Sequence, residues 1–300
     1  MANDYTAAAQ SIPAKLIKKL TEDADYIHPW HVQVSLTNRC NQNCSWCSCA
    51  DRDKSLELNM GQISKINFKL ASMRTEAVTI SGGGEPTLCK GFWEAVACFK
   101  NSGMRVGLTT NGKTLHEYDV LRFRLFDWVR ISLSSERLMD DNLRKVTSHP
   151  VTDWSFSWVL SGKDDGLYEV LEYAESNPSV THCRITRDIF DPSIKTPNKG
   201  NYKKAIWQDR GTYCRGPKEC WVSLLRPVIC PDGSVSPCCG IQYHGSKSAD
   251  GRWCRSIEEY ADRVAKQQPY DGRSCTRCYY DSYNQVLSAM KSDPHHAEFL

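Results

Sequence analysis

Short apolar segments alternate with amphipathic segments from residue 31 onward, and this alternation constrains the fold of the chain more than any other feature. The apolar segments predict strands at 31–36, 77–80, 104–108, 128–133, 155–160 and 182–185. Apolar residues at helical spacing predict helices between them, at 63–73, 92–101 and 166–176. Strands that alternate with helices are joined by crossover connections and form a parallel sheet. We therefore predict an α/β fold.

Groups of residues suited to chemistry follow several of these strands directly. A cysteine-rich loop follows the first strand, a glycine run follows the second, and Thr109 to Gly112 follow the third. In β/α barrels the carboxyl ends of the strands form the rim where active sites lie. The sequence therefore places a candidate site at this rim.

The loop after the first strand carries Cys40, Cys44 and Cys47, with three residues between the first pair and two between the second. Three thiolates on one short loop can hold three irons of a [4Fe–4S] cluster, whereas most protein clusters are held by four cysteines. The fourth iron is then open to a small molecule, which indicates catalysis rather than simple electron storage. A nearby fourth cysteine, Cys49, also permits a zinc-knuckle interpretation.

This spacing resembles the C-x3-C-x2-C loop of the radical S-adenosylmethionine (SAM) enzymes, and Trp46 matches the aromatic residue that usually precedes the third cysteine. The resemblance implies a SAM-binding [4Fe–4S] cluster whose open iron chelates the amino and carboxylate groups of SAM. One electron then breaks a carbon–sulfur bond of SAM, and the 5′-deoxyadenosyl radical takes a hydrogen atom from the substrate. The family fold is a partial (β/α)6 TIM-like barrel, which six predicted strands fit.

The glycine run after the second strand includes Gly83, Gly84, Glu85 and Pro86. Glycines at a strand end allow the backbone to approach a ligand closely, and a carboxylate can accept hydrogen bonds from an ammonium group. An ordinary βα turn is the alternative interpretation. The run resembles the GGEP motif of the same family, which implies contact with the amino group of SAM.

Further SAM contacts are implied by position in the family pattern. Ser132 and Ser134 lie on and just after the fourth strand, where ribose or carboxylate contacts usually occur. Asn111 lies just past the third strand, and Arg184 and Arg187 near the sixth could meet the SAM carboxylate as a bidentate fork. Each of them could instead form local hydrogen bonds at the rim.

The C-terminal third carries a second set of cysteines. The turn Pro231-Asp232-Gly233 predicts a β-hairpin between 226–230 and 234–237. Cysteines lie before and after this hairpin and again further along the chain, at Cys220, Cys238, Cys275 and Cys278. Four thiolates can hold a cluster, and two cysteine pairs can equally make a tetrahedral zinc ribbon site.

The second set resembles the opening of the SPASM extension, C-x(9–15)-G-x4-C followed by C-x2-C. The full SPASM pattern continues with more cysteines, but none follows Cys278. The resemblance therefore implies the truncated form, a twitch domain with one auxiliary [4Fe–4S] cluster. Its spacing is similar to that of a twitch-bearing aminocyclitol dehydrogenase and equally to that of peptide-modifying members, so a peptide and a small-molecule substrate both stay open.

Cys239 directly follows Cys238 and is a candidate catalytic residue. In some twitch-bearing peptide epimerases a free cysteine returns a hydrogen atom to the substrate radical, so the resemblance allows an epimerase or isomerase with Cys239 as the donor. An alternative cluster ligand and a buried spectator are the other interpretations.

These patterns predict three regions. Residues 1–30 form an N-terminal helical extension with an amphipathic helix at 11–21, residues 31–200 form the partial barrel, and residues 201–300 form a small cysteine-rich domain with the β-hairpin.

Composition limits the partners and the compartment. A net charge of +3 gives no general case for nucleic acid, although basic and aromatic residues mix at 202–221, where a solvated linker is the simpler interpretation. No apolar stretch is long enough to span a membrane, and no secretory signal is visible. An odd count of 15 cysteines then favours metal binding in a reducing compartment, the cytoplasm, over disulfides. The proposed chemistry needs a reducing partner such as flavodoxin or ferredoxin.

Two other protein classes compete with a SAM-cleaving enzyme. A non-enzymatic, zinc-stabilised interaction module explains the C-terminal cysteines but not a three-cysteine loop and a glycine run at neighbouring strand ends. An electron-transfer protein of the ferredoxin type normally uses four cysteines for each cluster and needs no barrel.

Overall fold

The computed structural model describes residues 26–47, 49–162, 164–188, 191, 193–208, 215–241, 252–275, 278 and 280–291. The helix predicted at 11–21 and nearly all of the predicted N-terminal extension lie outside the described residues.

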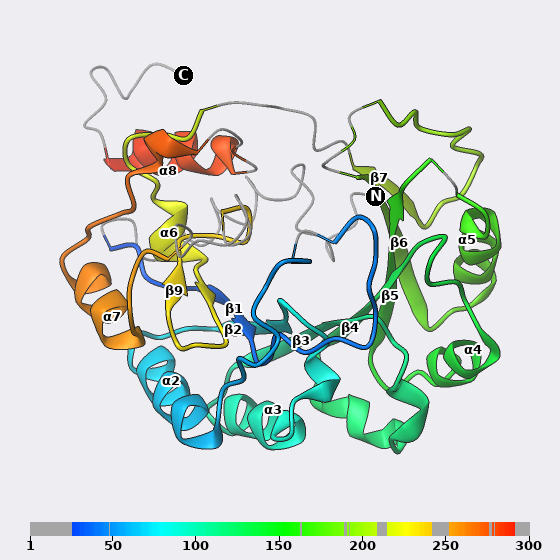
Figure 1. Cartoon of the computed structure of the whole chain (residues 1–300), viewed down its shortest axis with the longest axis horizontal. Helices are drawn as coiled ribbons and strands as arrows, with labels where there is room; N and C mark the ends of the chain where they lie inside the picture. The colour runs from blue at the N-terminus through cyan, green and yellow to red at the C-terminus, as the bar shows by residue number, and fades with distance from the viewer. Residues whose placement is uncertain are drawn as a thin grey trace.

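One curved sheet organises the described part of the chain (Figure 1). Its nine strands follow the order β7-β6-β5-β4-β3-β2-β1-β8-β9. Neighbouring strands from β7 to β8 are parallel, and only β9 is antiparallel to its neighbour. The strands are β1 His31–Ser35, β2 Ala77–Ser81, β3 Arg105–Thr110, β4 Trp128–Leu133, β5 Asp153–Leu160, β6 Val180–Arg187, β7 Ala205–Gln208, β8 Val228–Ile229 and β9 Val235–Ser236. The predicted parallel α/β fold is confirmed, and the barrel is open because β7 and β9 end the sheet without pairing to each other.

All six predicted parallel strands are present, but the sequence pattern missed β7 and did not predict that the first hairpin strand, β8, also joins the parallel sheet. β7 is short and only half-buried, and β8 has two residues, so neither carries a periodic apolar signal. The predicted hairpin is β8 and β9. Because β8 also pairs with β1, opposite Gln33 and Val34, the hairpin continues the main sheet. The predicted boundary at residue 201 therefore coincides with no break in the sheet, and the domain limits stay predictions.

The helices that connect β1 to β6 lie along the convex side of the sheet (Figure 1). The described helices are α2 Met60–Ser72, α3 Phe92–Asn101, α4 Asp141–Thr147, α5 Leu167–Ser176, α6 Val222–Leu225, α7 Ile257–Ala265 and α8 Asp281–Lys291. Helix α2 begins three residues before its predicted start because Asn59 and Gln62 form a capping box, with reciprocal bonds of 3.0 and 2.9 Å. None of the helices in the described part of the chain combines the length and the apolar character needed to cross a bilayer.

The two faces of the sheet differ sharply in chemistry. Along β4, Val129, Ile131 and Leu133 are at most 1% exposed and pack under the helices. Alternate residues point to the opposite, concave face, which we call the lumen. Pairing across β4, β5 and β6 sets two rows of lumen residues: an upper row, nearer the rim, of Ser132, Ser157 and Arg184, and a lower row of Arg130, Ser155 and His182. The lumen wall is therefore polar and carries arginines.

Candidate functional site

The three-cysteine loop leaves β1 at the rim and is closed at its base. Thr37 and Glu57 form an antiparallel bridge, and the Leu58 N–H donates to the Leu36 carbonyl at 2.9 Å. Arg39 forms an ion pair with Glu57 across the same base. These contacts hold the segment that carries the cysteines against the carboxyl end of the sheet.

The glycine run after β2 packs directly against this loop. The Gly84 N–H donates to the Thr37 carbonyl at 3.0 Å, and the Glu85 N–H donates to the Arg39 carbonyl at 2.7 Å. A Cβ atom on Gly84 would lie 2.0 Å from the Arg39 carbonyl oxygen, and one on Gly83 would lie 2.1 Å from Asn38 Oδ1. Only glycine permits this approach, so the two sequence motifs form one structural unit.

Glu85 is 2% exposed, and its carboxylate is fully engaged inside the protein. Oε1 accepts from the Thr87 N–H at 3.2 Å, the Thr87 hydroxyl at 2.8 Å and the Thr110 hydroxyl at 2.6 Å. Oε2 accepts from the Asn111 N–H at 2.7 Å. Burial raises the pKa of Glu85, although all four hydrogen bonds act to lower it. The carboxylate therefore ties the end of β3 to the glycine run.

Asn111 carries this connection to the cysteines. Its Nδ2 donates to Asn41 Oδ1 at 2.7 Å and lies 4.0 Å from the Cys40 sulfur. The Lys113 N–H donates to Asn111 Oδ1 at 3.0 Å and fixes the orientation of the amide. The sequence position just past the third strand thus brings Asn111 to the cysteine loop, next to a candidate metal ligand.

Two charged residues that sequence reasoning missed also hold the loop. Glu136, which follows β4, accepts from the Ser45 N–H at 2.9 Å and from its hydroxyl at 2.5 Å. Arg52 donates from Nη1 to the Cys47 sulfur at 3.6 Å and from Nε to the Asn38 carbonyl at 2.8 Å. Arg52 lies close enough to the cysteines in sequence to be suspected, whereas nothing in the sequence points to Glu136.

The thiols of Cys44 and Cys47 differ in pKa because their surroundings differ. Hydrogen bonds from the Cys49 side chain and backbone, with the Arg52 cation, lower the pKa of Cys47 to about 5 despite its partial burial. Burial, followed by the neighbouring Cys47, raises the pKa of Cys44 to about 11. Cys47 is therefore the more readily ionised of these two thiols at neutral pH.

The other predicted SAM contacts occupy different places. The hydroxyl of Ser132, in the upper row of the lumen, lies 3.3 Å from that of Ser157. Arg184 is also in the upper row. Ser134 is completely buried, and its hydroxyl accepts from the Glu136 N–H at 3.2 Å, so it shapes the turn that carries Glu136. Trp46 is half-buried in the cysteine loop.

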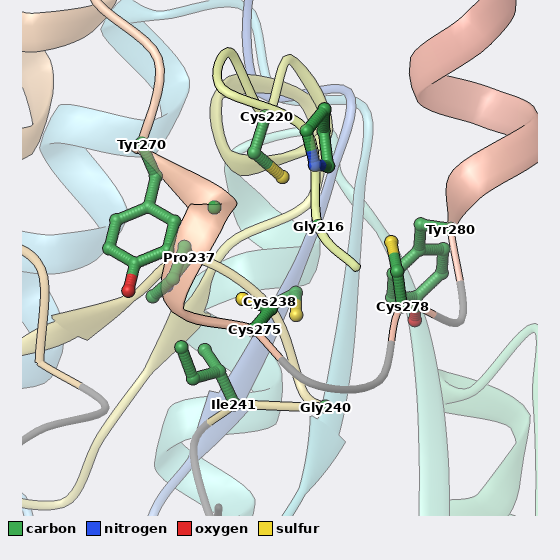
Figure 2. Close-up of a pocket in the computed structure, with 12 residues that line it drawn as sticks. Gly216, Cys220, Pro237, Cys238, Gly240, Ile241, Tyr270, Cys275, Cys278 and Tyr280 are labelled. Atoms are coloured by element: carbon green, nitrogen blue, oxygen red, sulfur yellow. The ribbon is translucent and has the colours of Figure 1, made fainter. Parts of the chain in front are cut away.

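The four C-terminal cysteines predicted as ligands gather around one pocket (Figure 2). They reach it from separate segments: before α6, after β9, at the end of the short 3₁₀ helix Gly272–Ser274, and before α8. The space between the pocket walls, including the part that is open to solvent, is about 450 Å³, and the lining includes Cys220, Cys238, Cys275 and Cys278. Four cysteines that are far apart in sequence therefore line one pocket.

Backbone pairing and one amide position these thiols. The Cys220 N–H donates to the Tyr270 carbonyl at 2.8 Å, and the Gly216 N–H donates to the Cys275 carbonyl at 3.1 Å. Asn284 of α8, 2% exposed, donates from Nδ2 to the Cys220 sulfur at 3.6 Å. Burial raises the pKa of Cys220, and it raises that of Cys275 to about 11. Both thiols are therefore neutral until a metal displaces their protons.

The spacing of the side chains bears on which metal group could fit. Within the described ranges, no three His, Cys, Asp or Glu side chains lie close enough together to ligate a single metal ion. A zinc ion bonded to thiolates at about 2.3 Å draws them to roughly 3.8 Å from one another. A cluster presents its metal atoms at separate corners and suits thiols that are spread around a pocket.

A chain of hydrogen bonds links this pocket to the lumen. The Cys239 sulfur lies 3.1 Å from the Tyr280 hydroxyl, which accepts from Arg226 Nη1 at 2.7 Å. Arg226 Nε donates to His31 Nδ1 at 3.2 Å, so the other ring nitrogen carries the proton and donates to the Thr79 hydroxyl at 2.6 Å. Burial, then the nearby arginines, lowers the pKa of His31 to about 3, so the ring is neutral.

Comparison with known proteins matches both the motif region and the fold. Residues 34–155 match the family model described as the Radical SAM superfamily. Streptococcus suis SuiB bound to S-adenosylmethionine is 13% identical over 88% of this chain and 71% of its own, with a TM-score of 0.60. SuiB bound to the precursor peptide SuiA is 12% identical over 93% and 77%, with a TM-score of 0.59. The protein anSMEcpe with bound AdoMet is 12% identical over 87% and 96%, with a TM-score of 0.54. At these identities the likeness to solved structures concerns the fold.

Proposed function

Because residues 34–155 match the Radical SAM superfamily model, we propose that this chain is a radical SAM enzyme that reductively cleaves SAM and removes a hydrogen atom from a bound peptide or small metabolite. The observation that carries the proposal is the single unit formed at the rim by the cysteine loop, the glycine run and Asn111. Cys40, Cys44 and Cys47 are the proposed ligands of the SAM-binding cluster.

When bound, the first cluster and SAM supply a 5′-deoxyadenosyl radical for hydrogen abstraction, and an auxiliary cluster supplies an acceptor for the electron left on the substrate. The chain's own residues bind and orient these groups. Arg52 and Asn111 direct N–H groups at ligand sulfurs, and such donors tune a cluster from outside its ligand shell. Because Glu85 already accepts four hydrogen bonds, the backbone of Gly83 and Gly84 is the proposed contact for the SAM amino group.

Cys220, Cys238, Cys275 and Cys278 are the proposed ligands of the auxiliary [4Fe–4S] cluster in a twitch-like domain. Their position around one pocket, together with the spacing of the four cysteines, supports a shared iron–sulfur group at this place. The chain from Cys239 through Tyr280 and Arg226 to His31 joins this pocket to the lumen, where a substrate would lie.

Two features bear on the substrate and the net reaction. SuiB is found with its precursor peptide bound, which supports a peptide as one substrate class. An acceptor cluster favours net oxidation. The contact between Cys239 and Tyr280 supports a second candidate, an epimerase in which the Cys239 thiol returns a hydrogen atom. Such chemistry suits a reducing compartment and a flavodoxin- or ferredoxin-type electron donor.

Anaerobic reconstitution with iron, sulfide, SAM and dithionite tests the main proposal. We expect 5′-deoxyadenosine from the native chain and none from a Cys44→Ser variant, since the loop then offers two thiolates. A Cys98→Ser variant is the matched control, because Cys98 lies on α3, outside both cysteine sets. A fully loaded native protein that forms no 5′-deoxyadenosine would contradict the proposal.

Metal analysis of a variant in which Cys40, Cys44 and Cys47 are all alanine tests the auxiliary site. We expect about four irons and matching sulfide for each chain. A stoichiometric zinc content with no iron would sink the auxiliary-cluster proposal while leaving SAM cleavage by the native chain unaffected.

Solvent deuterium separates the two net reactions. If Cys239 returns a hydrogen atom, the product formed in D₂O carries deuterium and the Cys239→Ala variant stops before product. Complete turnover of Cys239→Ala with deuterium still incorporated rejects that role.

A further inference from the structure

A second pocket is formed by residues of the lumen wall, away from both cysteine sets. The space between its walls, including the part that is open to solvent, is about 220 Å³, and the walls are formed by Trp128, Arg130, Ser155, Thr181 and His182. These residues come from β4, β5 and β6, and all five lie within the first three residues of their strands. The pocket therefore lies deeper in the lumen than the rim that carries the cysteine loop. None of the described residues that line it is acidic.

The indole of Trp128 forms one wall of the pocket, and the absence of a side chain at Gly107 leaves space for it. A Cβ atom on Gly107 of β3 would lie 2.2 Å from the indole ring, so a glycine at this lumen position is required. The Arg130 guanidinium stacks over the same ring, 5.0 Å from its centroid. Stacking engages the face of a guanidinium, whereas its N–H groups lie at the edge, where carboxylates and phosphates bind.

A β-bulge shapes the opposite wall. Trp154 pairs with Val180 and Ser155 pairs with His182, so Thr181 is an extra residue that is left between them. Its hydroxyl donates to the Trp154 carbonyl at 3.1 Å and lies 2.9 Å from His182 Nδ1. Because a hydroxyl has one proton, it must accept from the Nδ1–H, which fixes His182 as the tautomer with an accepting Nε2.

The positive charge of this pocket comes from arginine and not from histidine. Burial first, and then Arg130 and Arg184, lowers the pKa of His182 to about 3, so its ring is neutral. Arg130 also contributes to the low pKa of His31 on β1, at the other side of the lumen. Arg184 lies one row above Arg130, two strands away, and both side chains are long enough to turn toward a shared ligand.

We propose that this pocket is a substrate subsite for an anionic group, a carboxylate or a phosphate, with Arg130 as the binding cation and Trp128 and His182 as its walls. The inference rests on the proposed function, because it places the anionic end of the substrate below SAM in the same lumen. It names the substrate class as a molecule that carries such a group, either an acidic peptide segment or a phosphorylated or carboxylated metabolite.

Equilibrium dialysis of the reconstituted protein at saturating SAM tests the subsite with two labelled probes, inorganic phosphate and succinate. Saturating SAM occupies the site for its own carboxylate. We expect one probe to bind saturably, with one site for each chain, and the preferred probe identifies which anionic group the substrate carries. We expect Arg130→Gln to weaken that binding by about tenfold or more, because the bidentate, charged donor is lost.

Two further variants make the test specific. Arg130→Lys retains the charge without the fork and is expected to bind the probe more weakly than the native chain but more tightly than Arg130→Gln. Arg122 stacks over Trp93 at 5.4 Å in a similar pair outside the lumen, and Arg122→Gln is expected to leave binding unchanged. The absence of saturable binding, or equal binding by native, Arg130→Gln and Arg130→Lys proteins, overturns the inference.

Formation of 5′-deoxyadenosine in the same samples keeps the two proposals separate. Product from SAM without anion binding rejects only the subsite. Anion binding that depends on Arg130, without any 5′-deoxyadenosine from the loaded native protein, rejects only the proposed function.

Discussion

Replacement of Glu85 should show how strongly the candidate site depends on one buried carboxylate. In Glu85→Ala the hydroxyls of Thr87 and Thr110 can rotate to other acceptors, but the N–H groups of Thr87 and Asn111 cannot. Each buried donor without a partner costs about 1–3 kcal/mol. We therefore expect the free energy of unfolding, measured by urea titration, to fall by about 2–6 kcal/mol.

Glu85→Gln sharpens the same prediction. The amide oxygen can keep the three bonds now made to Oε1, whereas the amide nitrogen then faces the N–H of Asn111. Glu85→Gln leaves one N–H group facing another, whereas Glu85→Ala leaves two buried N–H groups without an acceptor. Glu85→Gln should therefore lower the free energy of unfolding by about 1–3 kcal/mol. Glu94→Ala, an exposed acid on α3, is the control and should change stability by less than about 0.5 kcal/mol.

A functional assay accompanies the stability measurement. Because Glu85 holds Asn111, and Asn111 holds the cysteine loop, both variants should also lose iron from the first cluster on dialysis against a chelator. A Glu85→Ala protein within about 1 kcal/mol of the native chain, or Gln as costly as Ala, would refute this reasoning.

Three further predictions concern the sheet. Burial raises the pKa of Asp127, but the hydrogen bond from the Val106 N–H and two nearby cations outweigh burial and hold that pKa below 3.8. The ionised carboxylate therefore stabilises the fold above pH 3.8, and this stabilisation is lost as the pH falls further. Asp127→Asn should cost about 1–3 kcal/mol at neutral pH and progressively less as the pH falls below 3.8, as measured by urea titration. Gly107→Ala should cost about 1–3 kcal/mol by overpacking and alter near-ultraviolet circular dichroism from Trp128. Burial is the main reason that His182 has a pKa of about 3 in the fold, against an ordinary 6.5. The contribution of His182 to stability is therefore fully present above about pH 6.5 and is lost as the pH falls toward 3. His182→Gln should make the free energy of unfolding less dependent on pH over this range.

Local chemistry explains what could be predicted from the sequence. The spacing of Cys40, Cys44 and Cys47 is a property of one short loop, and the glycine run needs only a strand before it. The pattern of apolar residues predicts the six main strands, because a strand that buries one face in the core needs apolar side chains on that face whichever strands lie beside it. The hairpin turn at Gly233, with a φ of 84°, is likewise local. These features identified the α/β fold and the cysteines on which the proposed function rests.

Only the tertiary structure decided how these parts meet. The pairing of β8 with β1 brings the C-terminal cysteines beside the barrel. Nothing in the sequence of either strand predicts that the two strands pair. Glu136 reaches Ser45 across 91 positions, and Asn284 reaches Cys220 across 64. The pocket that holds both Arg130 and His182 exists only because β4, β5 and β6 pair in a particular register. Such contacts join residues distant along the chain, and their partners are set by packing and register, which no local pattern encodes.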